Sequence, residues 1–131
     1  SQNIQRDALI KFSYVSPMAA CGICHDQCAA GMQAPGQSRE DFKALVAEIG
    51  ALAQAMGFPF PEDPVSRNLA ILDALAPDAS TSLKRDLDAG RPSEVDGLIF
   101  QVVRLGRQYQ VPTPMYDKVA AKLGFTWEGE A

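Results

Sequence analysis

The sequence has few residues of several kinds that would each point to a particular class of protein. It contains three cysteines in 131 residues, all of them between positions 21 and 28. Because their number is odd and they lie so close together, they cannot form a disulfide framework, and they favour a reducing compartment such as the cytoplasm. No apolar run approaches the roughly 18 residues that a membrane-spanning helix needs, so we expect no membrane segment.

Positive charge is scarce as well. Twelve Lys and Arg residues stand against 16 Asp and Glu residues, which gives a formal net charge of −4. Nucleic acids and anionic membranes are bound through clustered basic residues, so we expect neither as a main partner. The length suffices for one domain with a hydrophobic core and is too short for two ordinary domains. Since the first residue is Ser1 rather than Met, we expect a processed or shortened chain.

The apolar residues recur with a helical period almost throughout, and no segment shows the alternation that is typical of a strand. Ser38 followed by Asp41 resembles a capping box, and Gly57 is a suitable helix end. Between them runs the clearest apolar stripe: Phe42, Leu45, Val46, Ile49, Leu52, Ala53 and Met56. We therefore predict a single all-α domain of about six helices.

Local signals delimit four further helices. The pair Asp63-Pro64 is typical of a helix start and opens a helix that we expect to reach about residue 75. A short helix is predicted over 82–89, followed by an apolar stripe over 95–106. The pair Thr113-Pro114 opens the last predicted helix, which should reach about residue 123.

The first predicted helix covers residues 4–30 and contains Pro17, which should kink or split it because proline removes a backbone donor. Cys21, Cys24 and Cys28 are spaced i, i+3 and i+7 in this segment. On one helix this spacing places them on one face, where cysteine behaves as a small apolar residue of the core.

The stretch Cys21-Gly-Ile-Cys-His25 also admits a sharper interpretation. The pattern C-x-x-C-H is the attachment site of a c-type haem, for which His25 would be an axial ligand. Together with Cys24 and Cys28, these residues could alternatively ligate zinc, although zinc sites normally draw ligands from two separated pieces of chain. The pattern is short, so we favour packing in the core, and a small haem-binding or metal-binding module stays an alternative.

A longer pattern lies in residues 81–125, TSLKRDLDAGRPSEVDGLIFQVVRLGRQYQVPTPMYDKVAAKLGF. It contains a serine with an aspartate four residues later, a Glu-Val-Asp step, a helix, and Val-Pro-Thr-Pro before a last helix. This order resembles the C-terminal domain of ketopantoate reductases. The segment LIKFSYVSPMAA, residues 9–20, resembles the part of that family that begins Trp-x-Lys and runs into a proline-containing helix.

The resemblance implies an NADP-dependent oxidoreductase that reduces a 2-oxo acid, namely ketopantoate or a close analogue. In that family a dinucleotide-binding domain with a Gly-rich fingerprint precedes the helical domain, whereas this chain has no G-x-G-x-x-G sequence. We therefore expect residues 1–131 to be the helical substrate and catalytic domain alone, inactive by itself, with NADPH bound mainly by the absent N-terminal domain. An exposed interdomain face would also favour a homodimer.

The same resemblance assigns roles to individual residues. Lys11 matches the catalytic lysine, whose ammonium can polarise a carbonyl oxygen and supply its proton. Glu94 matches an acid that binds a substrate hydroxyl near this lysine, and Ser82 matches a serine that holds the substrate carboxylate. By their local pattern alone, Lys11 would be a surface charge, and Glu94 would follow a capping Ser93 at a helix start.

The sequence departs from the family at two positions. Family members typically carry an asparagine four and eight residues after the lysine, where this chain has Val15 and Ala19. A valine cannot form such hydrogen bonds, although Ser13 or Ser16 could take over part of the role. A related 2-oxo acid therefore fits as well as ketopantoate, and a stand-alone helical interaction domain without chemistry is a further alternative.

Overall fold

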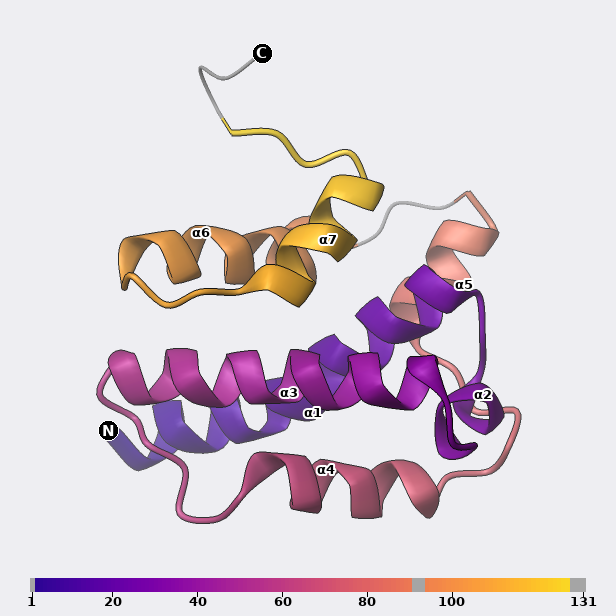
Figure 1. Cartoon of the computed structure of the whole chain (residues 1–131), viewed down its shortest axis with the longest axis horizontal. Coiled ribbons are helices and arrows are strands. Elements are labelled where there is room, and N and C mark those ends of the chain that lie inside the picture. The colour runs from indigo at the N-terminus through magenta and orange to yellow at the C-terminus, as the bar shows by residue number, and fades with distance from the viewer. Residues whose placement is uncertain (1, 91–93, 128–131) are drawn as a thin grey trace.

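The computed structural model describes residues 2–90 and 94–127, and every regular element among them is helical (Figure 1). The elements are α1 (Gln2–His25), α2 (Ala29–Gln33), α3 (Gln37–Ala55), α4 (Pro64–Asp73), α5 (Ser82–Asp88), the π-helical turn η1 (Asp96–Phe100), α6 (Gln101–Gln108) and α7 (Pro114–Lys122). The predicted all-α class is therefore confirmed. None of the described helices is both long and apolar enough to cross a membrane.

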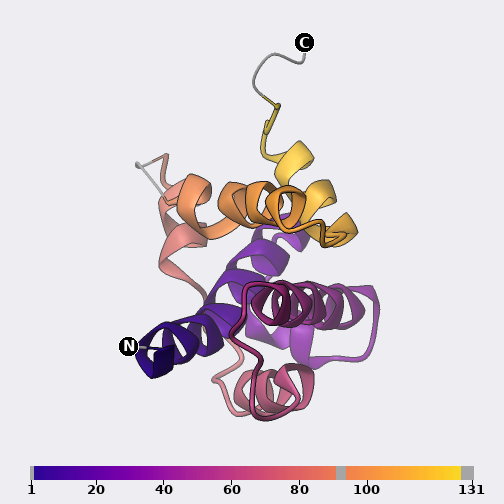
Figure 2. The same ribbon diagram turned by 90° about the vertical axis from the view of Figure 1, so that its left-hand side faces the viewer.

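The central helix is α3. It packs against α1 and lies between α4 on one side and the pair α6 and α7 on the other, as both views show (Figures 1 and 2). Its predicted apolar stripe is confirmed from Phe42 to Ala53, because its buried residues include Phe42, Leu45, Val46, Ile49, Leu52 and Ala53. Met56, the last residue of the predicted stripe, follows α3 and is half-buried. The 3.6-residue period places these side chains on one face, which forms the middle of the core.

Helix boundaries that depend on neighbouring residues are where the sequence places them. The Asp63 carboxylate accepts the backbone N–H groups of Val65 at 3.2 Å and Ser66 at 3.3 Å, and Pro64 is the first helical residue of α4. After α7, Gly124 has a φ of 92°, a left-handed conformation that glycine adopts without steric cost. Local capping chemistry therefore sets these two helix ends.

The capping box predicted for α3 is wrong. The residue that precedes α3 is Gly36, and no side chain caps the helix there. The Ser38 hydroxyl instead donates to the side-chain oxygen of Gln27 at 2.7 Å, and the Asp41 carboxylate lies 2.7 Å from Nε2 of His25. Both side chains are engaged by the end of α1 and the segment that follows it, so tertiary partners replace the expected local contacts.

The helix α1 ends earlier than predicted. Asp26 adopts a left-handed conformation with a φ of 51°, and the Gln27 N–H donates to the Gly22 carbonyl at 2.9 Å, which closes the helix in a Schellman-type turn. Cys28 lies beyond this turn and is exposed, whereas Cys21 is buried. The prediction that all three cysteines share one helix face is therefore wrong for Cys28.

Pro17 lies inside α1 without splitting it. Because proline has no N–H, the carbonyl of Ser13, four residues earlier, loses its helical donor. Asn68 of α4, whose side chain is fully buried, donates to this carbonyl at 3.1 Å and to the Ser13 hydroxyl at 3.0 Å. A side chain from another helix thus supplies the hydrogen bond that the proline removes.

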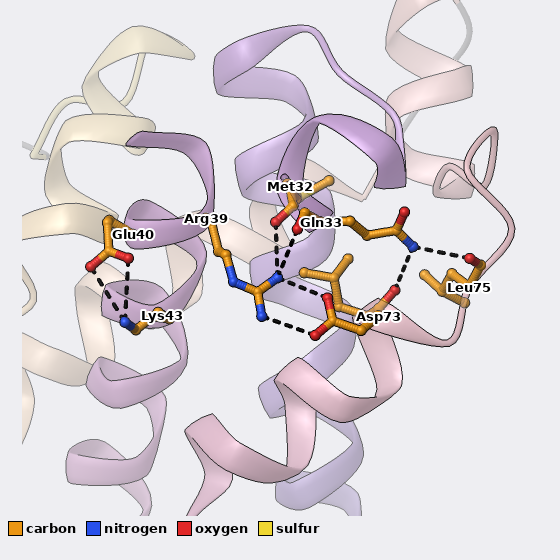
Figure 3. A network of polar contacts seen from close by, with 8 residues as sticks. Met32, Gln33, Arg39, Glu40, Lys43, Asp73 and Leu75 are labelled. Carbon is orange, nitrogen blue, oxygen red and sulfur yellow. Dashed lines mark hydrogen bonds and ion pairs between the residues drawn. The ribbon is translucent and has the colours of Figure 1, made fainter. Parts of the chain in front are cut away.

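The ends of α2 and α4 are joined by a polar network (Figure 3). The Arg39 guanidinium binds the two carboxylate oxygens of Asp73 at 2.8 and 2.9 Å, and it also donates to the Gln33 carbonyl at 3.2 Å. The Gln33 side chain in turn donates to the carbonyls of Leu72 at 2.8 Å and Leu75 at 3.0 Å. These contacts bind the last carbonyl of α2 and two carbonyls at and just beyond the C-terminal end of α4.

Candidate functional site

Lys11 lies near the middle of α1, and its side chain is exposed. Within the described part of the chain, its ammonium has no hydrogen-bond or ion-pair partner. On a regular helix, Lys11, Val15 and Gly22 fall on one stripe. At Gly22 this stripe meets α5, where the Lys84 side chain comes within 3.6 Å of an ideal Cβ position. Lys11 therefore projects from the face of α1 whose other end packs against α5.

The helix α5 begins at Ser82, whose side chain lies outside the described part of the structure. Thr81 caps the helix, since its hydroxyl accepts the backbone N–H of Lys84 at 3.1 Å. The Lys84 ammonium donates to Asp88 at 2.7 Å and to Asp26, just beyond α1, at 2.9 Å. These hydrogen bonds raise the pKa of Lys84 and hold α5 against the C-terminal end of α1.

Glu94 is exposed and stands just before the helix that contains η1. Its carboxylate also has no partner within the described residues, while its carbonyl accepts the Leu98 N–H at 2.9 Å. In η1 the Gln101 N–H donates to the Asp96 carbonyl, five residues back, which is the π-helical pattern. Nothing in the sequence predicted this turn, and the expected cap Ser93 lies outside the described residues.

The helices α1 and α7 and the turn η1 meet at two buried hydroxyl groups. The Ser16 hydroxyl donates to the Leu98 carbonyl of η1 at 2.5 Å, and its oxygen lies 2.7 Å from the Tyr116 hydroxyl oxygen. Both side chains are fully buried, and burial raises the pKa of Tyr116 far above its usual value, so this hydroxyl is neutral. The helix that carries Lys11 is thus hydrogen-bonded directly to the turn that follows Glu94.

The start of α7 is held by a carboxylate from α3. Glu48 accepts the backbone N–H groups of Met115 at 2.9 Å and Tyr116 at 3.0 Å. Burial raises the pKa of Glu48, and the two N–H donors oppose this effect. Thr113 precedes the helix as predicted, but its hydroxyl donates to Asp117 at 3.0 Å rather than capping backbone N–H groups. Sequence reasoning missed this cap because it comes from a distant helix.

Ser13 and Ser16 do not take the place of the two missing asparagines. Both residues are fully buried, and their hydroxyls are engaged inside the protein, Ser13 with the Ile10 carbonyl and Ser16 with η1. Val15 is half-buried and Ala19 is buried, and neither side chain can form a hydrogen bond. This face of α1 therefore lacks the amide groups that are typical of the family.

The haem or metal alternative gains no support from the geometry. Cys21 is fully buried, its thiol donates to the Ser38 carbonyl at 3.1 Å, and burial raises its pKa to about 11. His25 is engaged by Asp41, and Cys28 is exposed beyond the end of α1. Among the residues that the structure describes, no three His, Cys, Asp or Glu side chains are grouped so that they could hold a metal ion.

Lys11 therefore lies on α1, Ser82 begins α5, and Glu94 stands two residues before η1, while both α5 and η1 pack against α1. That Lys11, Ser82 and Glu94 face one cleft stays a prediction. Two surface depressions are lined by other residues than these three. One, of about 300 Å³, is bordered by α6 and the start of α7, and the other, of about 350 Å³, lies between α3 and the segment that leads into α4.

The chain is similar to known proteins over most of its length. The model of the family "Ketopantoate reductase PanE/ApbA C terminal" matches residues 3–125. The 2-dehydropantoate 2-reductase of Mesorhizobium japonicum is 34% identical over 79 residues, 60% of this chain and 24% of that protein. The enzyme of the same name from Caulobacter vibrioides is 31% identical over 102 residues, 78% of this chain and 32% of that protein.

The fold is similar to that of a solved structure as well. A dimeric ketopantoate reductase from Staphylococcus aureus superposes with a TM-score of 0.85 at 24% identity, over 94% of this chain and 43% of that one. The matched part of the chain spans 24% and 32% of the length of these two relatives. From the matched residues and the shared helical fold, the chain belongs to the ketopantoate reductase PanE/ApbA C-terminal family.

Proposed function

We propose that this chain is the helical substrate-binding and catalytic domain of an NADP-dependent reductase of 2-oxo acids, acting on ketopantoate or a close analogue. The family match over residues 3–125 is the observation that carries this proposal. The exposure of Lys11 and Glu94 supports it, because both charged groups are open to a substrate and neither has a partner among the described residues. In addition, Ser16 of α1, the helix that carries Lys11, donates a hydrogen bond to η1, the turn that follows Glu94.

The proposed chemistry delivers a hydride to the carbonyl carbon of the substrate and a proton to its oxygen. A nicotinamide cofactor, when bound, supplies the hydride. The Lys11 ammonium binds the carbonyl oxygen, stabilises the negative charge that develops there, and donates the proton. Glu94 accepts a hydrogen bond from a substrate hydroxyl. Ser82, at the start of α5, binds the substrate carboxylate.

The cofactor site is assigned to a separate part of the protein. This chain contains no G-x-G-x-x-G sequence, and no strand occurs among its described residues, so it lacks the strand–turn–helix unit that binds a dinucleotide. We therefore infer an N-terminal dinucleotide-binding domain that binds NADPH and closes a cleft against α1, α5 and η1. Lys11 and Glu94 have no charge partner among residues 2–90 and 94–127, which is consistent with a face that another domain covers.

Two further features belong to this proposal. We infer a homodimer, because the Staphylococcus aureus relative is described as dimeric; a monomer in light scattering at high protein concentration would count against it. We also infer a location in the reducing cytoplasm, since the three cysteines are free and Cys21 is buried.

The proposal is tested by following NADPH oxidation with ketopantoate and other 2-oxo acids in the enzyme that contains this chain. Lys11→Ala should lower kcat by about 10²-fold to 10⁴-fold, the usual contribution of a positioned proton donor. Its melting temperature should not change, because the side chain is exposed and has no partner in the part of the chain that the structure describes. Lys118→Ala, at an exposed position of α7, is the matched control and should keep full activity. Equal activity of the two variants would overturn the assignment of Lys11.

A further inference from the structure

The hydrogen bonds at the junction of α1, η1 and α7 have a defined direction. The Leu98 carbonyl can only accept, so the single proton of the Ser16 hydroxyl is donated to it. The Ser16 oxygen can then only accept from Tyr116, whose hydroxyl oxygen lies 2.7 Å away. The Tyr116 hydroxyl therefore donates to Ser16, and the Ser16 hydroxyl donates to the Leu98 carbonyl, so each hydroxyl proton has one acceptor. Both side chains are fully buried, so water does not compete for these groups.

This chain of hydrogen bonds extends to the backbone of Glu94. Both backbone polar groups of Leu98 are hydrogen-bonded: its N–H donates to the Glu94 carbonyl at 2.9 Å, and its carbonyl accepts from Ser16. Ser16 follows Lys11 by five residues on α1, a rise of about 7.5 Å along the helix axis. Lys11 and Glu94 are thus connected by a short helical segment and two hydrogen bonds.

The π-helical form of η1 sets the direction in which Glu94 points. A π-helical turn holds one residue more than an α-helical turn, as the bond from the Gln101 N–H to the Asp96 carbonyl shows. One residue corresponds to about 100° of rotation around a helix axis. If η1 relaxed to an α-helix while α6 stayed in place, Glu94 would turn away by about that angle. The bond from Ser16 to Leu98 joins this turn to α1.

We propose that Ser16 and Tyr116 are positioning residues for the proposed reaction. They hold η1 in its π-helical form against α1, and they thereby set the place of Glu94 relative to Lys11. Glu48 completes the arrangement, since it binds the backbone N–H of Tyr116 and fixes the start of α7. This inference rests on the proposed function for its chemical consequence, whereas the effect of Ser16 on η1 does not depend on any activity.

The first experiment measures amide hydrogen exchange in this chain. In Ser16→Ala the Gln101 amide should exchange at least about tenfold faster than in the parent protein, beyond any increase that the change in global unfolding explains. The reason is that the π-helical turn opens locally. Tyr116→Phe should have a smaller effect in the same direction, and Ser16→Thr, which keeps the hydroxyl, should restore protection. Ser13→Ala is the matched control, since Ser13 is an equally buried serine of α1 that contacts α4 instead of η1. Unchanged exchange in Ser16→Ala would overturn the proposal.

The second experiment measures the pH dependence of kcat in the enzyme that contains this chain. Glu94→Gln removes the carboxylate of the proposed site and should shift this profile, and a Glu94 that is displaced from Lys11 should shift it in the same direction. We expect this shift in Ser16→Ala and in Glu94→Gln, and not in Ser13→Ala or Ser16→Thr. A Ser16→Ala enzyme with the parent profile would overturn the positioning role. A parent enzyme that reduces no 2-oxo acid would refute the proposed function instead, and hydrogen exchange would still decide whether Ser16 holds η1.

Discussion

The helix α1 and the helix made of η1 and α6 both depart from regular α geometry, and they do so in different ways. In α1 a backbone donor is missing at Pro17, whereas in η1 a residue is added to one turn. Each irregularity is bound by a buried polar side chain from another helix, Asn68 at the Ser13 carbonyl and Ser16 at the Leu98 carbonyl. Buried backbone groups need hydrogen-bond partners, so an irregular helix in a core requires such a side chain.

The two irregularities differ in how they are encoded. The irregularity in α1 can be predicted from the sequence, because proline is the residue that lacks a backbone N–H. The π-helical turn has no comparable residue, and it is maintained by what surrounds it: α1 through Ser16, and α7 through Tyr116. The irregularity in α1 should therefore respond to substitutions of Pro17 and of its partner Asn68. The π-helical turn should respond to substitutions of Ser16 in α1 and Tyr116 in α7.

The largest effect is expected at Asn68. Asn68→Ala should lower the free energy of unfolding by about 2 to 3 kcal/mol, because the buried Ser13 carbonyl loses the donor that replaces the proline N–H. In a Pro17→Ala background the cost should be smaller by about 1 kcal/mol, since the new N–H at position 17 can bind this carbonyl. Urea denaturation of the four proteins measures the difference. Equal costs in both backgrounds would show that Asn68 does not compensate for the proline.

A smaller effect is expected where α6 approaches the loop before α7. An added Cβ at Gly106 would lie 2.8 Å from Cγ2 of Thr113 and 3.0 Å from the Val111 carbonyl. Gly106→Ala should therefore destabilise the protein by about 1 to 3 kcal/mol. Gly97→Ala in η1 is the control, because its Cβ would meet nothing within 4 Å. Thermal unfolding compares the two, and a similar loss in both would mean that this close approach is not the cause.

The smallest effect concerns Glu48 and depends on pH. Burial raises the pKa of Glu48 above its ordinary value of 4.5, so the folded state holds this proton more tightly than the unfolded state. The associated stabilisation is complete below pH 4.5 and is lost as the pH rises through the raised pKa. Glu48→Gln removes this contribution and keeps an oxygen that can accept the N–H groups of α7.

Denaturation at a series of pH values from 4 upward tests this prediction. The stability of the parent protein relative to Glu48→Gln should fall as the pH rises. Asp63 and Asp73, whose pKa values are lowered by Ser66 and Arg39, change stability in the opposite direction, but they are present in both proteins and cancel. A relative stability that rises with pH would mean that the two N–H donors outweigh burial at Glu48.

Sequence reasoning succeeded where neighbouring residues decide the structure. The apolar stripe of α3 and the Asp63 cap of α4 depend on residues within a few positions of one another, and both are confirmed. It failed for Ser38 and Asp41, because His25 and Gln27 engage both side chains from the end of α1 and the segment after it. For the candidate site, the order of residues along the chain predicts Lys11, Ser82 and Glu94, and both their roles and their convergence on one cleft stay predictions.

The sequence by itself determined the all-α class, most helix boundaries and membership of the family, because apolar periodicity, capping residues and motif order are local properties of the chain. Only the tertiary structure decided that Asn68 serves the carbonyl left free by Pro17, that Glu48 caps α7, and that η1 is π-helical. Each of these features satisfies a backbone group of one helix with a side chain from another. Such a partner is selected by burial and proximity in the folded core, and no spacing along the chain specifies it.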